Sequence, residues 1–140
     1  MTDIVSRQTR SRMMAGIRGQ DTFPELTVRR FLHRAGFRFR IAAARLPGKP
    51  DIVLPKHRTV VFVHGCFWHR HSRCKYATVP ATRRKFWLTK FEENVARDKR
   101  VQRLLRRDGW RVLVVWECRL AMCDLESLQR KILAPRSLRR

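Results

Sequence analysis

The sequence contains few acidic residues. It has 11 Asp and Glu against 33 Lys and Arg in 140 residues, which gives a formal net charge of +22. A chain of this size with so large an excess of one charge repels itself unless a polyanion lies nearby. The charge therefore favours nucleic acid as the partner, with an anionic membrane surface as the alternative.

The sequence also lacks long apolar runs. The most apolar ones, Thr59–Val63 and Val112–Trp116, are far shorter than the roughly 20 residues that a membrane-spanning helix requires. The opening MTDIVSRQTR has no apolar stretch of the kind that marks a secretory signal peptide. We therefore expect an intracellular protein without membrane contact, whose four cysteines are metal ligands or free thiols rather than disulfides.

The composition is that of a single globular domain, with 44% hydrophobic residues. The spacing of apolar positions predicts helices over about 22–36, 82–107 and 124–133. Alternating or β-branched runs predict strands at 37–41, 51–54, 59–63 and 111–117. This order, α-β-β-β-α-β-α, is typical of an α/β fold with a mixed central sheet flanked by helices.

A basic arm at residues 1–21 precedes the predicted domain at 22–134, and a short basic tail follows at 135–140. The arm contains a small apolar island that includes Met14 and Ile17. One interpretation is a surface helix that packs its apolar stripe on the domain. The other is an arm that reaches DNA and offers these side chains as wedges between base steps.

Soft metal ligands are concentrated in the segment HGCFWHRHSRC. Cys66, His71 and Cys74 have the short spacing of zinc ligands on one loop. A fourth ligand must come from elsewhere, and both Cys118, after the last predicted strand, and Cys123 are available. Three cysteines and one histidine fill a tetrahedral site, which indicates structural zinc. The alternative is two buried cysteines beside solvated histidines.

A second group of residues is suited to phosphodiester hydrolysis. Asp51 begins one predicted strand close to the end of the next, where carboxylate and backbone oxygens can bind Mg²⁺, and Glu25 can join through water. The alternative for Asp51 is a hydrogen bond to the local backbone. His64 and His69 are not needed by one zinc ion, so either can act as general base or contact phosphate.

Four segments give the chain a specific resemblance: LPGKPDIV, VFVHGCFWHRH, VPATRRKFWLTKFEENVARDKR and DGWRVLVVWEC. They resemble the very short patch repair (Vsr) DNA mismatch endonucleases, from about Thr9 to Cys118. The resemblance implies a restriction-endonuclease-like fold with a structural zinc. It also implies nicking of one DNA strand on the 5′ side of the T in a T:G mismatch, which arises by deamination of 5-methylcytosine.

The resemblance implies a role for each hydrolytic residue. Asp51 and the backbone carbonyl of Val63 match the Mg²⁺ ligands, and Glu25 matches a residue that holds metal-bound water. His69 matches the general base, with Asp98 as its carboxylate partner.

The resemblance also places His64 near the scissile phosphate. The zinc ligands that it implies are Cys66, His71, Cys74 and Cys118, which leaves Cys123 as a free thiol. The DNA-contacting residues that it implies are Phe67, Trp68 and Trp87, which wedge beside the mismatch, and Met14 and Ile17 in the arm. Aromatic wedges unstack a base step most easily at a weakened mispair. The alternative is an apolar cluster of Phe67 and Trp68 that caps the zinc site.

The resulting hypothesis is a Mg²⁺-dependent, zinc-stabilised endonuclease that leaves a 5′-phosphate and a 3′-hydroxyl. The alternative is a catalytically silent, zinc-stabilised nucleic-acid-binding module. Asp51, His69 and Asp98 distinguish the two, because carboxylates beside a phosphate groove only weaken binding. The expected partners are double-stranded DNA with a T:G mismatch and mismatch-repair accessory proteins. We expect a monomer in the bacterial cytoplasm, associated with the nucleoid.

Overall fold

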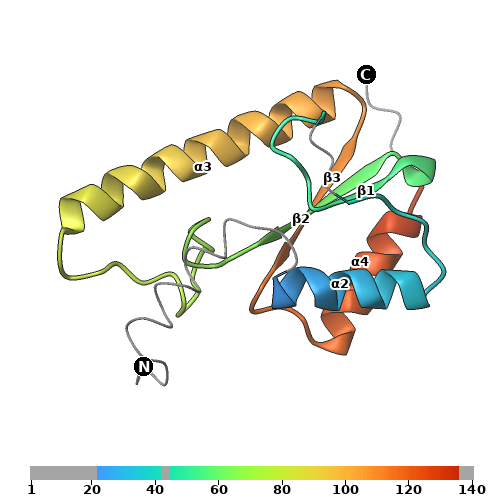
Figure 1. The fold of residues 1–140 in the computed structure, drawn as a ribbon, viewed down its shortest axis with the longest axis horizontal. Helices are drawn as coiled ribbons and strands as arrows, with labels where there is room; N and C mark the ends of the chain where they lie inside the picture. Colours follow the sequence, from blue (N-terminus) through green and yellow to red (C-terminus); the bar gives the residue numbers. More distant parts are fainter. Residues whose placement is uncertain (1–21, 42–44, 136–140) are drawn as a thin grey trace.

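The computed structural model describes residues 22–41 and 45–135 of the chain (Figure 1). The arm predicted for residues 1–21, with Met14 and Ile17, lies outside the described residues, as does the tail from residue 136 onward. The described part contains one sheet and three α-helices, in the order helix, two strands, helix, strand, helix. The predicted α/β class with a mixed sheet is confirmed.

The first described helix, α2 (Phe23–Arg34), has clear signals at both ends. Thr22 precedes it in extended backbone, and its side chain accepts an N–H of the first turn at 3.4 Å. Pro24 lies in that first turn, where its missing N–H has no helical partner to lose. Gly36 follows with φ +93°, a conformation that glycine adopts without strain. The helix thereby begins with Glu25 buried on its inner side.

A three-stranded sheet forms the centre of the fold, in the order β1 (Ile52–Leu54), β2 (Thr59–His64) and β3 (Arg111–Trp116). A single turn of 3₁₀-helix, η1 (Pro55–His57), joins the first two strands. β2 pairs antiparallel with β1 and parallel with β3. The parallel pair is in register to its end, because His64 lies opposite Trp116.

The strand predicted at 37–41 is wrong. Only Arg40 pairs, through an isolated antiparallel bridge with Val53 in which both hydrogen bonds are 2.8 Å long. The backbone N–H of Phe37 donates instead to the carbonyl of Leu32 at 3.0 Å, so this apolar residue closes the end of α2. β1 offers at most three partners on this side, and only Val53 is used.

The long helix α3 (Arg84–Arg107) connects the two parallel strands. Parallel neighbours require a crossover, and the 24 residues of α3 provide one about 36 Å long. The helix begins two residues later than predicted, after Arg83 in left-handed backbone at φ +55°. α4 (Met122–Leu133) follows β3 and closes the described chain. In the described part of the chain, no helix is both long enough and apolar enough to cross a membrane.

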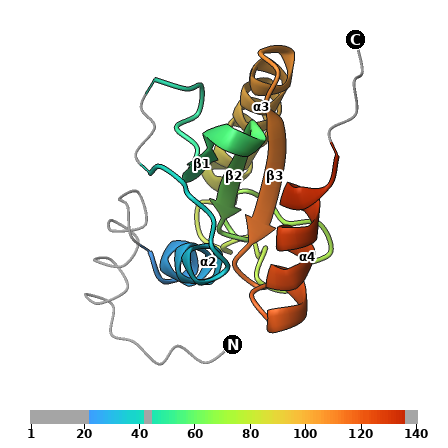
Figure 2. The ribbon, with the colours of Figure 1, turned by 90° about the vertical axis from the view of Figure 1, so that its right-hand side faces the viewer.

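The helices cover the two faces of the sheet in different ways (Figure 2). One core lies between the sheet and the pair α2 and α4, and its fully buried members are Val28, Leu32, Ile52, Leu54 and Val61. The second core lies between the other face and α3, and it contains Val53, Val60, Phe62, Leu105 and Val112. Because helices pack on both faces, the sheet is held rigidly, and so are the C-terminal ends of β2 and β3.

Candidate active site and metal centre

The functional residues gather where β2 and β3 end together. Because the two strands are parallel and in register, their C-terminal ends lie at the same edge of the sheet. The chain leaves β2 into a long segment, 65–83, and leaves β3 into a short one, 117–121. The middle of α3 contacts the first segment through hydrogen bonds of Asn94 and Asp98, and Figure 1 shows the course of this helix.

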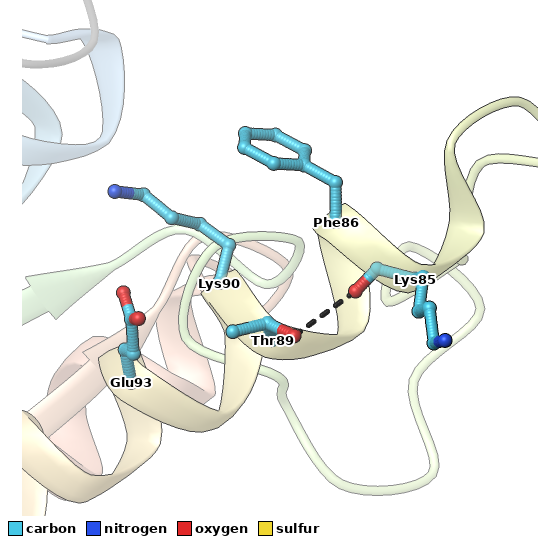
Figure 3. Close-up of a pocket in the computed structure, with 5 residues that line it drawn as sticks. All are labelled: Lys85, Phe86, Thr89, Lys90 and Glu93. Carbon is cyan, nitrogen blue, oxygen red and sulfur yellow. Dashed lines mark hydrogen bonds between the residues drawn. The ribbon is translucent and has the colours of Figure 1, made fainter.

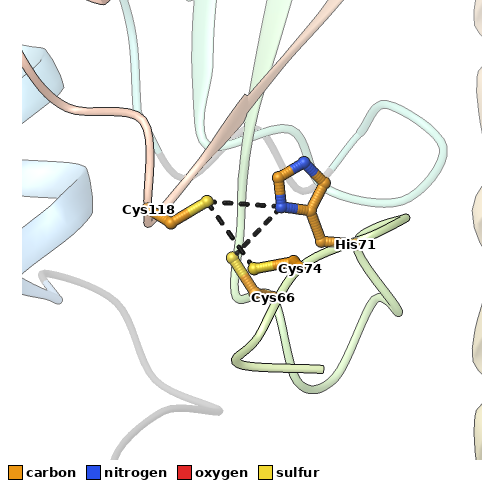
Figure 4. Close-up of side chains that lie close together, drawn as sticks. All are labelled: Cys66, His71, Cys74 and Cys118. Carbon is orange, nitrogen blue, oxygen red and sulfur yellow. Dashed lines mark hydrogen bonds between the residues drawn. The ribbon is translucent and has the colours of Figure 1, made fainter. Parts of the chain in front are cut away.

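Four soft ligands converge at this edge (Figure 4). Cys66, His71 and Cys74 come from the segment after β2, and Cys118 follows β3; all four ligand atoms lie within 4.8 Å of one another. The Sγ atoms of Cys74 and Cys118 are 3.8 Å apart, and the Nδ1 atom of His71 is 3.5 and 3.3 Å from the Sγ atoms of Cys66 and Cys118. Two sulfurs at about 2.3 Å from one zinc ion, at tetrahedral angles, are about 3.8 Å apart. The donor set therefore fits tetrahedral zinc.

Cys66 is a buried thiol that is protonated in the metal-free chain. Its thiol is fully buried, and burial raises its pKa to about 12, with smaller contributions from Cys118 and Cys74. A bound divalent cation deprotonates such a thiol and turns it into a ligand. All four positions of the tetrahedron are filled by protein, which is the arrangement of a structural site. Cys123, the other cysteine considered as fourth ligand, is exposed and lies outside this group.

Two residues next to Cys118 support the metal centre, and sequence reasoning missed both. The ring of Trp116 stacks on His71, with centroids 4.2 Å apart and an interplanar angle of 11°. The Oε1 atom of Glu117 accepts the backbone N–H of Cys66 at 2.9 Å. Their position at the end of a predicted strand, directly before a candidate ligand, was the available signal.

His69 and Asp98 form a close pair. The Nδ1 atom of His69 lies 2.7 Å from Oδ2 of Asp98, which projects from the middle of α3. A carboxylate at Nδ1 favours the tautomer with the proton on that nitrogen. The Nε2 atom is then the basic one. Sequence reasoning paired these two residues, and the structure brings them together.

His64 lies flat against His69, with ring centroids 3.8 Å apart and an interplanar angle of 6°. Burial of His64, followed by the charge of His69, lowers its pKa to about 4, although Asp98 acts in the opposite direction. His64 is therefore neutral at neutral pH. His64 therefore places an uncharged ring against His69.

Asp51 directly precedes β1, the strand that pairs antiparallel with β2, and it lies beside the C-terminal end of β2. Its Oδ2 atom accepts the backbone N–H of Val63 at 2.6 Å, so the hydrogen bond reaches across to β2 and does not cap the local chain. Burial raises the pKa of Asp51 to about 6; the bond from Val63 lowers it, and the neighbouring carboxylate of Glu25 raises it further. Glu25 in turn accepts a hydrogen bond from Arg29 at 3.0 Å. The carboxylates of Asp51 and Glu25 thus lie close enough to raise the pKa of Asp51, and two such oxygen donors are the type that a hard divalent cation binds.

The three aromatic residues selected from the sequence pack against one another and against α3. The ring of Phe67 lies 5.0 Å from Trp68, 5.7 Å from Trp87 and 5.1 Å from Phe91, all edge to face. Phe67, Trp68 and Trp87 remain half-buried, whereas Phe91 is buried. The cluster sits between the segment after β2 and the helix.

Arg70 and Asn94 hold this segment in place, and neither was selected from the sequence. The guanidinium of Arg70 donates to the carbonyls of Phe67, Ala77 and Thr78 at 2.9 to 3.1 Å and lies 3.8 Å from the centre of the Phe91 ring. Asn94 donates to the carbonyl of Trp68 at 3.2 Å. Their partners are mainly backbone carbonyls, which every residue has, so the sequence pattern does not predict the roles of Arg70 and Asn94. The one signal is that Asn94 shares a helix face with Phe91 and Asp98.

Comparison with known proteins adds an independent result. Residues 2–75 match the family model described as DNA mismatch endonuclease Vsr. The chain is 47% identical to the Type II nicking enzyme V.XorIIP of Xanthomonas oryzae pv. oryzae, over 96% of this chain and 99% of that protein. It is 48% identical to DNA mismatch endonuclease Vsr of Escherichia coli, over 86% and 76% of the two chains. It is also 48% identical to the Type II nicking enzyme V.NmeAIP of Neisseria meningitidis, over 86% and 85%.

Proposed function

Because the chain belongs to the Vsr family of DNA mismatch endonucleases, we propose that it nicks one strand of duplex DNA on the 5′ side of the T in a T:G mismatch. The nick would begin very short patch repair of deaminated 5-methylcytosine. One observation carries the proposal: the His69–Asp98 pair and the buried carboxylate of Asp51, which accepts the N–H of Val63, lie at the same strand end. Consecutive residues of β2, Val63 and His64, connect the two groups.

In this proposal His69 is the general base. Its Nε2 atom takes a proton from water, and the Asp98 carboxylate at Nδ1 holds the ring and stabilises the imidazolium that forms. The water oxygen forms a new bond to phosphorus, and the bond from phosphorus to the 3′ oxygen breaks. That oxygen gains a proton from solvent, so the products are a 5′-phosphate and a 3′-hydroxyl.

Asp51, the carbonyl of Val63 and Glu25 are the groups we propose to hold Mg²⁺. Within a strand, the N–H and C=O of one residue face the same neighbour. The N–H of Val63 already points to Asp51, so its carbonyl lies on that side as well. This all-oxygen set suits Mg²⁺, with Glu25 acting through water. When bound, the ion would polarise the phosphoryl oxygen and neutralise charge on the leaving oxygen.

The segment after β2 is the part we propose to face the mismatch. Phe67, Trp68 and Trp87 are half-buried aromatics, suited to enter a weakened base step at lower cost than a paired one. Arg73 and Lys75 line an open hollow of about 710 Å³ beside Cys74, where a phosphate can be neutralised. Zinc at the Cys66 centre would fix the shape of this segment.

The remaining proposals concern the setting of the reaction. The mixed sheet with helices on both faces is compatible with a restriction-endonuclease-like fold. A net charge of +22 opposes self-association, which supports a monomer. Relatives that act on DNA support a location at the nucleoid in the bacterial cytoplasm, with mismatch-repair accessory proteins as partners.

Strand scission of a labelled duplex with one T:G mismatch tests the proposal. We expect a single nick 5′ of the T with Mg²⁺, no nick with EDTA, and no nick in a fully paired duplex. An Asp51→Ala protein should bind the duplex and leave it intact. Tight binding by the unsubstituted protein without scission under any of these conditions would instead establish the silent binding module.

A further inference from the structure

The C-terminal half of α3 carries an unbroken basic face. Between residues 99 and 107 the helix has no acidic side chain and five exposed cations, namely Lys99, Arg100, Arg103, Arg106 and Arg107. At about 100° per residue they fall within an arc of roughly 120°. Leu105, on the opposite side, is fully buried in the core against the sheet. These five residues are called the α3 ridge below.

The stability of the helix does not explain the α3 ridge. Like charges three or four residues apart on a helix destabilise it by about 0.2–0.5 kcal/mol per pair. The helix dipole favours cations only in the last turn, which accounts for Arg106 and Arg107 but not for Lys99, Arg100 or Arg103. Among the described residues, no carboxylate forms an ion pair with any of the five. A polyanionic partner outside the domain would offset this repulsion.

The other half of the same helix has a different surface (Figure 3). There Lys85 and Lys90 share an open hollow of about 530 Å³ with Glu93, Thr89 and the half-exposed Phe86. Cations alternate with an acid and an apolar ring, as on an ordinary solvated helix. Within α3, the surface that carries cations without acids is therefore confined to the α3 ridge.

We propose that the α3 ridge is a second DNA-contact surface, which binds backbone phosphates of the duplex that flank the mismatch. Its eight steps of helix rise cover about 12 Å, the axial length of three to four nucleotides of one strand at about 3.4 Å each. The ridge starts one residue after Asp98 but faces away from it, so it meets phosphates other than the scissile one. The inference rests on the proposed DNA function.

The test compares two triple variants with equal loss of charge. The ridge variant carries Lys99→Gln, Arg103→Gln and Arg107→Gln. The control variant carries Lys56→Gln, Arg130→Gln and Lys131→Gln, which are exposed positions on η1 and on α4, the helix on the opposite face of the sheet. Affinity is measured against salt concentration for a T:G duplex and a paired duplex. Each is made at roughly one helical turn and at roughly three turns.

On the long duplexes, we expect the plot of log affinity against log salt to be less steep for the ridge variant, its negative slope smaller in magnitude by about 3, one for each neutralised side chain. The loss should be equal for mismatched and paired DNA, because phosphate contacts carry no sequence information. On the short duplex both variants should bind and nick like the unsubstituted protein. Equal slopes for the ridge and control variants on long DNA would overturn the proposal.

This design separates the inference from the function on which it rests. Nicking of the short T:G duplex by all three proteins, with no difference in salt slope, removes the α3 ridge and keeps the endonuclease. A ridge-dependent slope without nicking by the unsubstituted protein removes the endonuclease and keeps the DNA-contact surface.

Discussion

The imidazole rings of His64 and His69 are stacked 3.8 Å apart, while the carboxylate of Asp98 lies 2.7 Å from the edge of the second ring. One face and one nitrogen of His69 are therefore fixed by neighbours. The stacked partner is buried and stays neutral, because burial and the charge of His69 lower its pKa to about 4. In the proposed reaction His69 takes the proton, and the neutral ring of His64 packs against it.

The lowered pKa of His64 predicts a specific loss of stability in acid. An unfolded histidine has a pKa near 6.5, so between that pH and about 4 the unfolded chain binds more protons than the folded one. The free energy of unfolding should therefore fall as the pH drops through this window, by up to about 3 kcal/mol from this residue. Urea unfolding across the window should show a shallower fall in His64→Gln.

His33→Gln, at an exposed position of α2, provides the matched control for His64. The pH slope is the readout, since the absolute stability of a variant with an altered buried side chain changes for other reasons. Identical slopes in His64→Gln and His33→Gln would contradict the assigned neutral state.

Asp98→Asn tests the histidine–carboxylate pair. The amide keeps the shape of the side chain but cannot stabilise an imidazolium on His69 as a carboxylate does, so we expect the nicking rate to fall by about 10²- to 10⁴-fold. Affinity for the mismatched duplex should be retained. Glu92→Gln, which removes the same charge from the exposed side of α3, is the control and should nick at the original rate. A rate loss shared by both variants would assign the effect to charge alone.

Asp51→Asn should separate stability from activity. The folded state holds a proton on Asp51 more tightly than the unfolded chain does between pH 3.8 and about 6, so stability falls as the pH rises through this window. Asn removes the cost of the charge, and the metal-free variant should be more stable at neutral pH by about 1–2 kcal/mol after allowance for solvent screening. Mg²⁺-dependent nicking should disappear.

Asp108→Asn, at an exposed carboxylate after α3, is the control for Asp51 and should change neither quantity. Thermal unfolding and the scission assay measure both on the same samples. An Asp51→Asn protein that is less stable than the original would show that the carboxylate stabilises the fold, against the prediction.

The cysteine cluster predicts one zinc ion per chain. Elemental analysis of protein dialysed without strong chelator should give a ratio near one, and Cys74→Ser should lower it towards zero. Loss of the ion should cost roughly 3 kcal/mol or more of stability, because metal binding to such a site contributes directly to folding. Cys123→Ser should keep both the metal and the stability, since this thiol is exposed and apart from the cluster. A metal-free original protein would refute the assignment.

Much of the architecture could be predicted because its signals are local. The β-branched run at Thr59–Val63 predicts a strand, and the spacing of apolar residues in α3 predicts a helix; both signals come from residues close together in the sequence. The strand predicted at 37–41 is wrong because the alternation of apolar and Arg residues has another cause. The N–H of Phe37 donates to Leu32 at the end of α2, and only Arg40 pairs with a strand.

The site was predictable where ligand chemistry restricts the residue type. Structural metal sites rich in sulfur are built from Cys and His, so three candidate ligands could be identified in one loop and a fourth placed near the end of a parallel strand. The hydrogen bonds from Arg70 to the carbonyls of Ala77 and Thr78 could not be predicted, because every residue offers a backbone carbonyl. The stacking of His64 on His69 depends on the path of the chain between them, which the residue types leave open.

The metal centre also sets an order of events during synthesis. Cys74 and Cys118 are 44 residues apart, and all of α3 and β3 lies between them. A chain still on the ribosome displays the loop ligands long before the last one emerges. The four-ligand cluster therefore cannot be complete until Cys118 has emerged, after all of α3 and β3.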